Sequence, residues 1–89
     1  MIRRTVLFAG RVQGVGFRYT ACRIAEDYAV TGYVKNLPDG RVEAVVEGEI
    51  AQIERFVTAL RQDMAGNIRD LQQHDGAAVG EFRRFDVRF

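Results

Sequence analysis

Cysteine, histidine and long apolar runs are scarce in this sequence of 89 residues. The single cysteine, Cys22, excludes an internal disulfide. The single histidine, His74, has no second histidine or cysteine at ligand spacing, so we expect no metal site and no cofactor. The N-terminal region lacks the apolar run of a signal peptide or membrane helix, which favours a cytoplasmic protein without membrane contact.

An excess of positive charge is also lacking. Thirteen Lys and Arg residues face twelve Asp and Glu residues, which leaves a net charge of +1. Nucleic-acid binders usually carry a basic surface, so we expect no nucleic-acid partner and only a local anion site. The hydrophobic fraction of 47% and the charged fraction of 28% are those of a globular protein. We therefore expect one domain over residues 1–89, acting as a monomer.

The pattern of apolar residues predicts alternating strands and helices. Apolar residues recur at helical spacing from Phe17 onward and from Ile50 to about Met64. Short β-branched or alternating segments predict strands. These segments are residues 5–10, 30–35, 41–47, 67–74 and 82–89, and residues 75–80 are predicted as a surface loop. The order indicates an α+β, ferredoxin-like βαββαβ sandwich, in which two helices cover one face of an antiparallel sheet, with room for a short extra C-terminal strand.

A glycine-containing loop joins the first predicted strand to the first predicted helix. Gly14 and Gly16 allow several backbone N–H groups to turn toward one point, and the helix N-terminus adds partial positive charge. Arg18, in the first helical turn, opposes the helix dipole unless an anion lies nearby, and its planar guanidinium suits phosphate oxygens. The alternative is a tight turn followed by a solvated arginine. The spacing matches neither a Walker loop nor a dinucleotide fingerprint.

Two segments of this chain resemble the signatures of the acylphosphatase family. They are GRVQGVGFR at residues 10–18 and GYVKN at residues 32–36. The resemblance implies metal-independent hydrolysis of acyl phosphates to carboxylate and inorganic phosphate. It also implies that Arg18 neutralises the phosphoryl group and that Asn36 orients the attacking water, although an asparagine there also suits an ordinary turn. The implied phosphate-binding residues are Gln13, Gly14, Val15, Gly16, Phe17 and Arg18.

Two residues depart from the family pattern. Tyr33 stands where relatives often have tryptophan, and Leu37 follows Asn36 where many relatives have threonine. We expect packing to survive the first change and Asn36 to be held less firmly after the second. We also expect little selection on the acyl group, and we expect Arg18 to pair with an acidic group such as the carboxylate at Phe89 when no phosphate is bound.

Two rival interpretations keep the fold but do not make the chain a free-standing hydrolase. A sheet that binds nucleic acid requires exposed aromatic side chains, for which Phe8 and Tyr33 are the candidates. An accessory module of a larger maturation or carbamoyl-transfer enzyme would share the same domain. We prefer the free-standing hydrolase, because the sequence shows no partner domain and the charge is nearly balanced.

Overall fold

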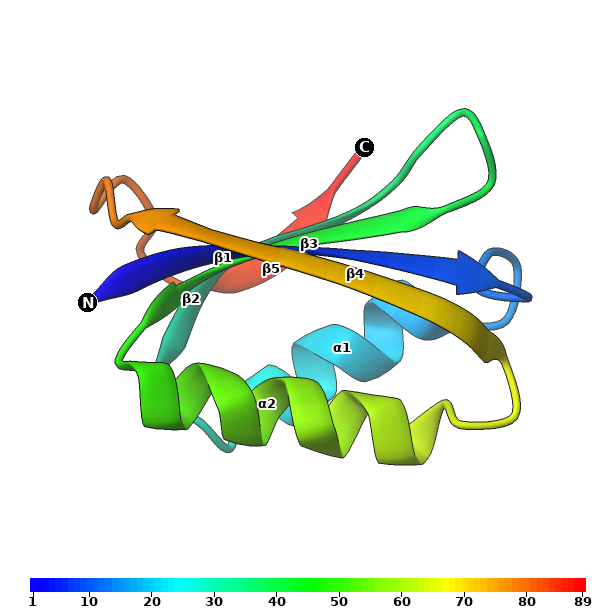
Figure 1. Ribbon diagram of the computed structural model, residues 1–89, viewed down its shortest axis with the longest axis horizontal. Coiled ribbons are helices and arrows are strands. Elements are labelled where there is room, and N and C mark those ends of the chain that lie inside the picture. The colour runs from blue at the N-terminus through cyan, green and yellow to red at the C-terminus, as the bar shows by residue number, and fades with distance from the viewer.

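Two helices lie on one face of a five-stranded sheet in the computed structural model, which describes residues 1–89 (Figure 1). The strand order across the sheet is β4-β1-β3-β2-β5. The elements are β1 (Ile2–Gly10), α1 (Phe17–Ala25), β2 (Val30–Asn36), β3 (Val42–Gly48), α2 (Ile50–Asp63), β4 (Ile68–Ala77) and β5 (Phe85–Arg88). The predicted ferredoxin-like sandwich is confirmed, including the short C-terminal strand.

The last strand gives the sheet a mixed character. Strands β1 to β4 pair antiparallel, as predicted, whereas β5 runs parallel to β2 and aligns Gly32 with Phe85 and Lys35 with Arg88. The pairing is parallel because the chain crosses from the far edge strand β4 to the opposite edge of the sheet. This crossover brings the end of the chain beside α1.

The lengths of the outer strands differ from the sequence prediction. Strand β4 continues to Ala77, so the predicted loop at residues 75–80 begins only after that residue. The strand is polar because it forms an edge, where nine of its ten residues pair only with β1 and most side chains are exposed. Strand β5 is shorter than predicted, because residues 82–84 cross the sheet before the pairing begins.

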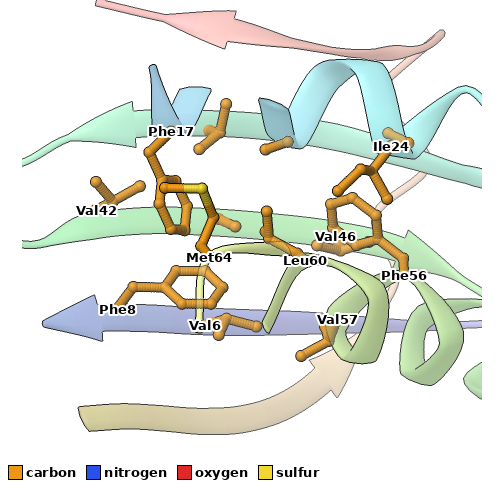
Figure 2. Packing of buried hydrophobic residues seen from close by; sticks show 14 of the residues in the cluster. Val6, Phe8, Phe17, Ile24, Val42, Val46, Phe56, Val57, Leu60 and Met64 are labelled. Atoms are coloured by element: carbon orange, nitrogen blue, oxygen red, sulfur yellow. The ribbon is translucent and has the colours of Figure 1, made fainter. Parts of the chain in front are cut away.

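Alternating apolar side chains of the sheet build one core under the helices. Val6 and Phe8 of β1 and Val42 of β3 are fully buried, and they face Phe17 of α1 and Leu60 of α2 (Figure 2). The Phe8 and Phe17 rings lie 4.9 Å apart between centroids, in a tilted arrangement. Burial of an aromatic side chain stabilises a fold by a few kcal/mol. Phe17 therefore fixes the first turn of α1 against the sheet.

One glycine allows the central strands to approach closely. Gly32 in β2 has a φ of 140°, and a Cβ atom placed there would lie 1.8 Å from the carbonyl oxygen of Val45 in β3. No other residue fits this approach without moving one of the strands. The contact sets the position of β2, at whose end Asn36 lies.

Candidate active site

The loop between β1 and α1 presents backbone donors that the protein itself does not use. Gly14 and Gly16 both adopt a left-handed conformation with a φ of 76°, and Gly16 caps α1 without a side-chain hydrogen bond. None of the N–H groups of residues 12–16 is bonded to a backbone carbonyl, and the Thr20 N–H makes the first bond, to the Gly16 carbonyl. Free donors next to a helix N-terminus form an anion-binding concavity.

Arg18 and Asn36 line the same cavity beside this loop. The cavity has a volume of about 390 Å³. Side chains alternate along β2, so Asn36 points to the face that carries Val34 and α1. The residues that line the cavity are Val12, Gly14, Gly16, Phe17, Arg18, Tyr19, Cys22, Asn36, Asp86, Val87 and Phe89. Two residues 18 positions apart in the sequence thus meet at one site, together with the start of α1.

The side chain of Asn36 has an unused acceptor. Its Oδ1 atom is buried and has no hydrogen-bond partner. A buried acceptor without a partner costs about 1–3 kcal/mol. Such an atom is suited to receive a hydrogen bond from a molecule in the cavity.

The guanidinium of Arg18 contacts the aromatic ring of Phe89. Its guanidinium carbon lies 5.1 Å from the centroid of the Phe89 ring. Arg18 forms no ion pair with a carboxylate, so the expected pairing with the carboxylate at Phe89 is wrong in this structure. The contact is a cation–π interaction, which orients the guanidinium and leaves its charge uncompensated for an anion.

Gln13 has a role that the sequence did not indicate. Its side-chain amide donates hydrogen bonds to the carbonyl oxygens of Leu37, at 2.8 Å, and Arg41, at 2.9 Å. The Leu37 N–H in turn donates to the Arg41 carbonyl at 2.8 Å. The turn after Asn36 is therefore tied to the loop between β1 and α1 through the Gln13 side chain, while the backbone N–H of Gln13 stays free.

The remaining predicted loop residues occupy different positions. Gly14, Gly16, Phe17 and Arg18 line the cavity, whereas the side chain of Val15 packs against the core. Phe17 is buried, so only its backbone is available to a ligand. The sequence did not indicate Tyr19, Asp86 or Val87 as part of the site. It expected Phe89 beside Arg18 through the terminal carboxylate, whereas the structure places the Phe89 ring there. Asp86 and Val87 lie on β5, which reaches the cavity through its parallel pairing with β2.

The one cysteine of the chain lies beside the site as a thiol. Burial, reinforced by the nearby Asp86 and Glu26 carboxylates, raises the pKa of the Cys22 thiol, which keeps it protonated. Asp86 lies 3.2 Å from the guanidinium of Arg84. His74 is exposed on β4, and no three His, Cys, Asp or Glu side chains cluster as metal ligands would.

The two aromatic residues considered for stacking with nucleic acid, Phe8 and Tyr33, are both occupied within the fold. Phe8 is fully buried beneath the helices. The Tyr33 hydroxyl donates to Glu43 at 2.9 Å, and the Arg88 guanidinium covers the Tyr33 ring at 3.9 Å from its centroid. Burial and the hydrogen bond to Glu43 raise the pKa of Tyr33. The tyrosine at this position thus keeps an aromatic packing role and uses its hydroxyl within the sheet.

Comparison with known families identifies the chain. Residues 4–87 match the family described as Acylphosphatase. The chain belongs to the acylphosphatase family. An acylphosphatase of Syntrophotalea carbinolica is 44% identical over 89 residues, which are 99% of this chain and 97% of that protein.

Solved structures agree with this acylphosphatase assignment. The crystal structure of acylphosphatase from Bacillus subtilis superposes with a TM-score of 0.88 and 31% identity, covering 100% of both chains. HypF of T. kodakarensis matches with a TM-score of 0.85 and 34% identity, but this chain covers only 12% of it. Hydrolysis of acyl phosphates is the known activity of the acylphosphatase family, so the predicted enzyme class is confirmed. Neither helix has the length and hydropathy of a membrane-spanning segment.

Proposed function

We propose that this chain hydrolyses acyl phosphates whose phosphoryl group is held by the backbone N–H groups of residues 13–18 and by the Arg18 guanidinium. Asn36 orients the attacking water. The observation that carries the proposal is the single cavity that contains the free loop backbone, the uncompensated Arg18 and the unused oxygen of Asn36. Backbone donors and one guanidinium match a phosphoryl dianion in charge and geometry.

The reaction needs few titratable groups. Water attacks phosphorus, the P–O bond to the acyl group breaks, and the carboxylate leaves with the electron pair. The water protons stay with the phosphate or pass to solvent. A carboxylate leaving group has a conjugate acid with a pKa of about 4, so it needs no general acid at neutral pH. Phosphoryl transfer then depends mainly on positioning and on charge stabilisation, which Arg18 and the loop supply without a metal ion.

Asn36 suits a water molecule beside a dianion. A neutral carboxamide offers an acceptor oxygen to the water and an NH₂ donor to the phosphate, whereas an aspartate would be repelled. The unpartnered oxygen supports this role, because a bound water would supply the missing hydrogen bond. Gln13 anchors the turn after Asn36 through the Leu37 carbonyl.

Hydrolysis of benzoyl phosphate in the presence of EDTA tests the proposal. Arg18→Ala should weaken inhibition by inorganic phosphate and lower kcat/KM by about 100- to 1000-fold. Asn36→Ala should lower kcat by a similar factor and leave phosphate inhibition nearly unchanged. Arg61→Ala, on the exposed side of α2, is the matched control and should behave like the native chain. A folded native chain that turns over neither benzoyl nor acetyl phosphate would show a binding module instead of an enzyme.

The enzyme acts as a monomeric single domain in the cytoplasm. One core of 17 buried residues joins both helices to the sheet, which supports one folding unit. Among the exposed large apolar side chains, Tyr19 and Phe89 line the cavity, and Met1, Ile50 and Val79 lie outside it. Light scattering during gel filtration should give the monomer mass of 10.1 kDa, and a concentration-independent mass near twice that value would contradict the proposal.

A further inference from the structure

Two exposed aromatic side chains stand at the cavity that holds Arg18 and Asn36. Tyr19 is 73% exposed and Phe89 is 92% exposed, and both line this cavity. The chain exposes only three other large apolar side chains, none of which lines it. Aromatic side chains left in water beside a binding cavity mark a surface for an apolar ligand group.

Phe89 is placed directly beside the phosphate-binding arginine. Its ring lies 5.1 Å from the guanidinium carbon of Arg18. In an acyl phosphate the acyl carbon is separated from phosphorus by one bridging oxygen. If Arg18 grips the phosphoryl group, the acyl group therefore starts within a few bonds of Arg18, where it can reach the Phe89 ring.

Partly exposed apolar surface at the cavity also comes from Val87. The half-buried Cys22 thiol adds to it, since burial raises its pKa and keeps it protonated. A flat apolar acyl group can cover this surface and remove it from water, whereas an acetyl group covers little of it. The free energy gained grows with the apolar area that is covered.

On the basis of the proposed function, we propose that Tyr19 and Phe89 form an acyl-group subsite that favours acyl phosphates with an aromatic or similarly flat, apolar acyl group. Phe89 has a second effect, because its ring holds the Arg18 guanidinium. The subsite replaces the expectation of little selection with a graded preference.

The experiment compares kcat/KM for benzoyl phosphate and acetyl phosphate in the native chain and in variants. Tyr19→Ala and Phe89→Ala should each lower the ratio of benzoyl to acetyl kcat/KM by about 10-fold, the scale of discrimination in an apolar pocket. Comparing this benzoyl-to-acetyl ratio between the native chain and each variant cancels the intrinsic difference in reactivity of the two substrates. Val79→Ala is the matched control, because Val79 is 65% exposed and lies outside the cavity.

Inhibition by inorganic phosphate separates the two effects of Phe89. Phosphate has no acyl group, so Tyr19→Ala should leave its inhibition constant unchanged. Phe89→Ala and Phe89→Leu should both raise that constant about 3-fold, because they remove a cation–π contact of about 0.5–1 kcal/mol. Phe89→Leu should retain more of the benzoyl preference than Phe89→Ala, since leucine still offers apolar surface.

The outcomes distinguish this inference from the proposed function. If the native chain hydrolyses both substrates and the ratio is unchanged in Tyr19→Ala and Phe89→Ala, the subsite is overturned and the hydrolase stands. An equal fall of the ratio in Val79→Ala would also overturn the subsite. If the folded native chain hydrolyses neither substrate, the proposed function itself fails. Circular dichroism establishes that each variant is folded.

Discussion

At the scale of single residues, the side chain of Gln13 couples the two halves of the site. Its amide spans the loop and the turn that follows Asn36, through the carbonyls of Leu37 and Arg41. Gln13→Ala keeps the free backbone N–H and removes both side-chain bonds. We expect kcat to fall about 10-fold, inhibition by phosphate to stay within a factor of two, and the free energy of unfolding to fall by about 1–2 kcal/mol.

Gln73→Ala is the control for this prediction, because Gln73 is exposed on β4. Steady-state kinetics with phosphate as inhibitor, together with urea unfolding, give the required values. A loss of phosphate binding without a loss of kcat would show that the Gln13 side chain contributes to the phosphate site and not to the position of Asn36.

At the scale of the elements, the contact between β2 and β3 decides whether Asn36 reaches the cavity. A Cβ atom on Gly32 would lie 1.8 Å from the Val45 carbonyl oxygen, so the strands must separate or shift in Gly32→Ala. We expect a loss of about 3 kcal/mol or more in the free energy of unfolding. Gly66→Ala is the matched control, since nothing lies within 4 Å of its Cβ position, and it should change stability by less than about 1 kcal/mol.

Thermal or urea unfolding of the two glycine variants checks this prediction. Equal stability of Gly32→Ala and Gly66→Ala would mean that β2 tolerates displacement from β3. A Gly32→Ala variant that is stable but inactive would show that the contact between β2 and β3 is needed to position Asn36.

At the scale of the whole molecule, Glu47 ties the segment before β5 to the sheet. This carboxylate is 4% exposed, and it accepts hydrogen bonds from Arg3 at 2.7 Å and from the N–H groups of Val79 at 2.8 Å and Gly80 at 2.9 Å. Burial alone would raise the pKa of Glu47, but these donors together bring the pKa below its ordinary value of 4.5. Glu47 therefore stabilises the fold in its charged form.

The sign of the pH dependence follows from that lowered pKa. The stabilisation is complete above pH 4.5 and disappears as the pH falls through the lower pKa of the folded state. Glu47→Gln should cost about 2 kcal/mol at pH 7, the scale of hydrogen bonds to a charged group, and should flatten the loss of stability below pH 4.5. Urea unfolding from pH 3 to pH 7 measures both effects. If the stability of Glu47→Gln falls with decreasing pH as steeply as that of the native chain, the acid sensitivity is due to other carboxylates.

The sequence predicted those parts of the molecule that local patterns determine. The start of α1 at Phe17 follows from apolar spacing, and the end of α2 near Met64 follows from the same rule. The two glycines of the loop were identified because they let backbone N–H groups turn toward one point. Arg18 was identified because an arginine in the first turn opposes the helix dipole unless an anion lies nearby. The structure places Arg18 and Asn36 at one cavity, as the family motifs imply.

The features that the sequence did not predict depend on contacts between distant segments. The polar residues 75–77 form a strand only because β1 supplies the partner, so no alternation marks them. The parallel pairing of β5, the contact of the Phe89 ring with Arg18 and the bonds of Gln13 to the turn result from three-dimensional neighbours. The spacing of residues within one segment does not predict these contacts.

The central position of β1 also bears on how fast the molecule folds. The strand pairs Ile2 with both Gly48 and Ala77, so its two neighbours come from the middle and the far part of the sequence. The chain must close long loops, at an entropic cost, before either pairing is rewarded. Small domains dominated by such distant contacts fold in milliseconds to seconds, whereas helical bundles fold in microseconds to milliseconds. We therefore expect this chain to refold slowly for its size. Strand β1 should become stably paired only when both β3 and β4 are in place.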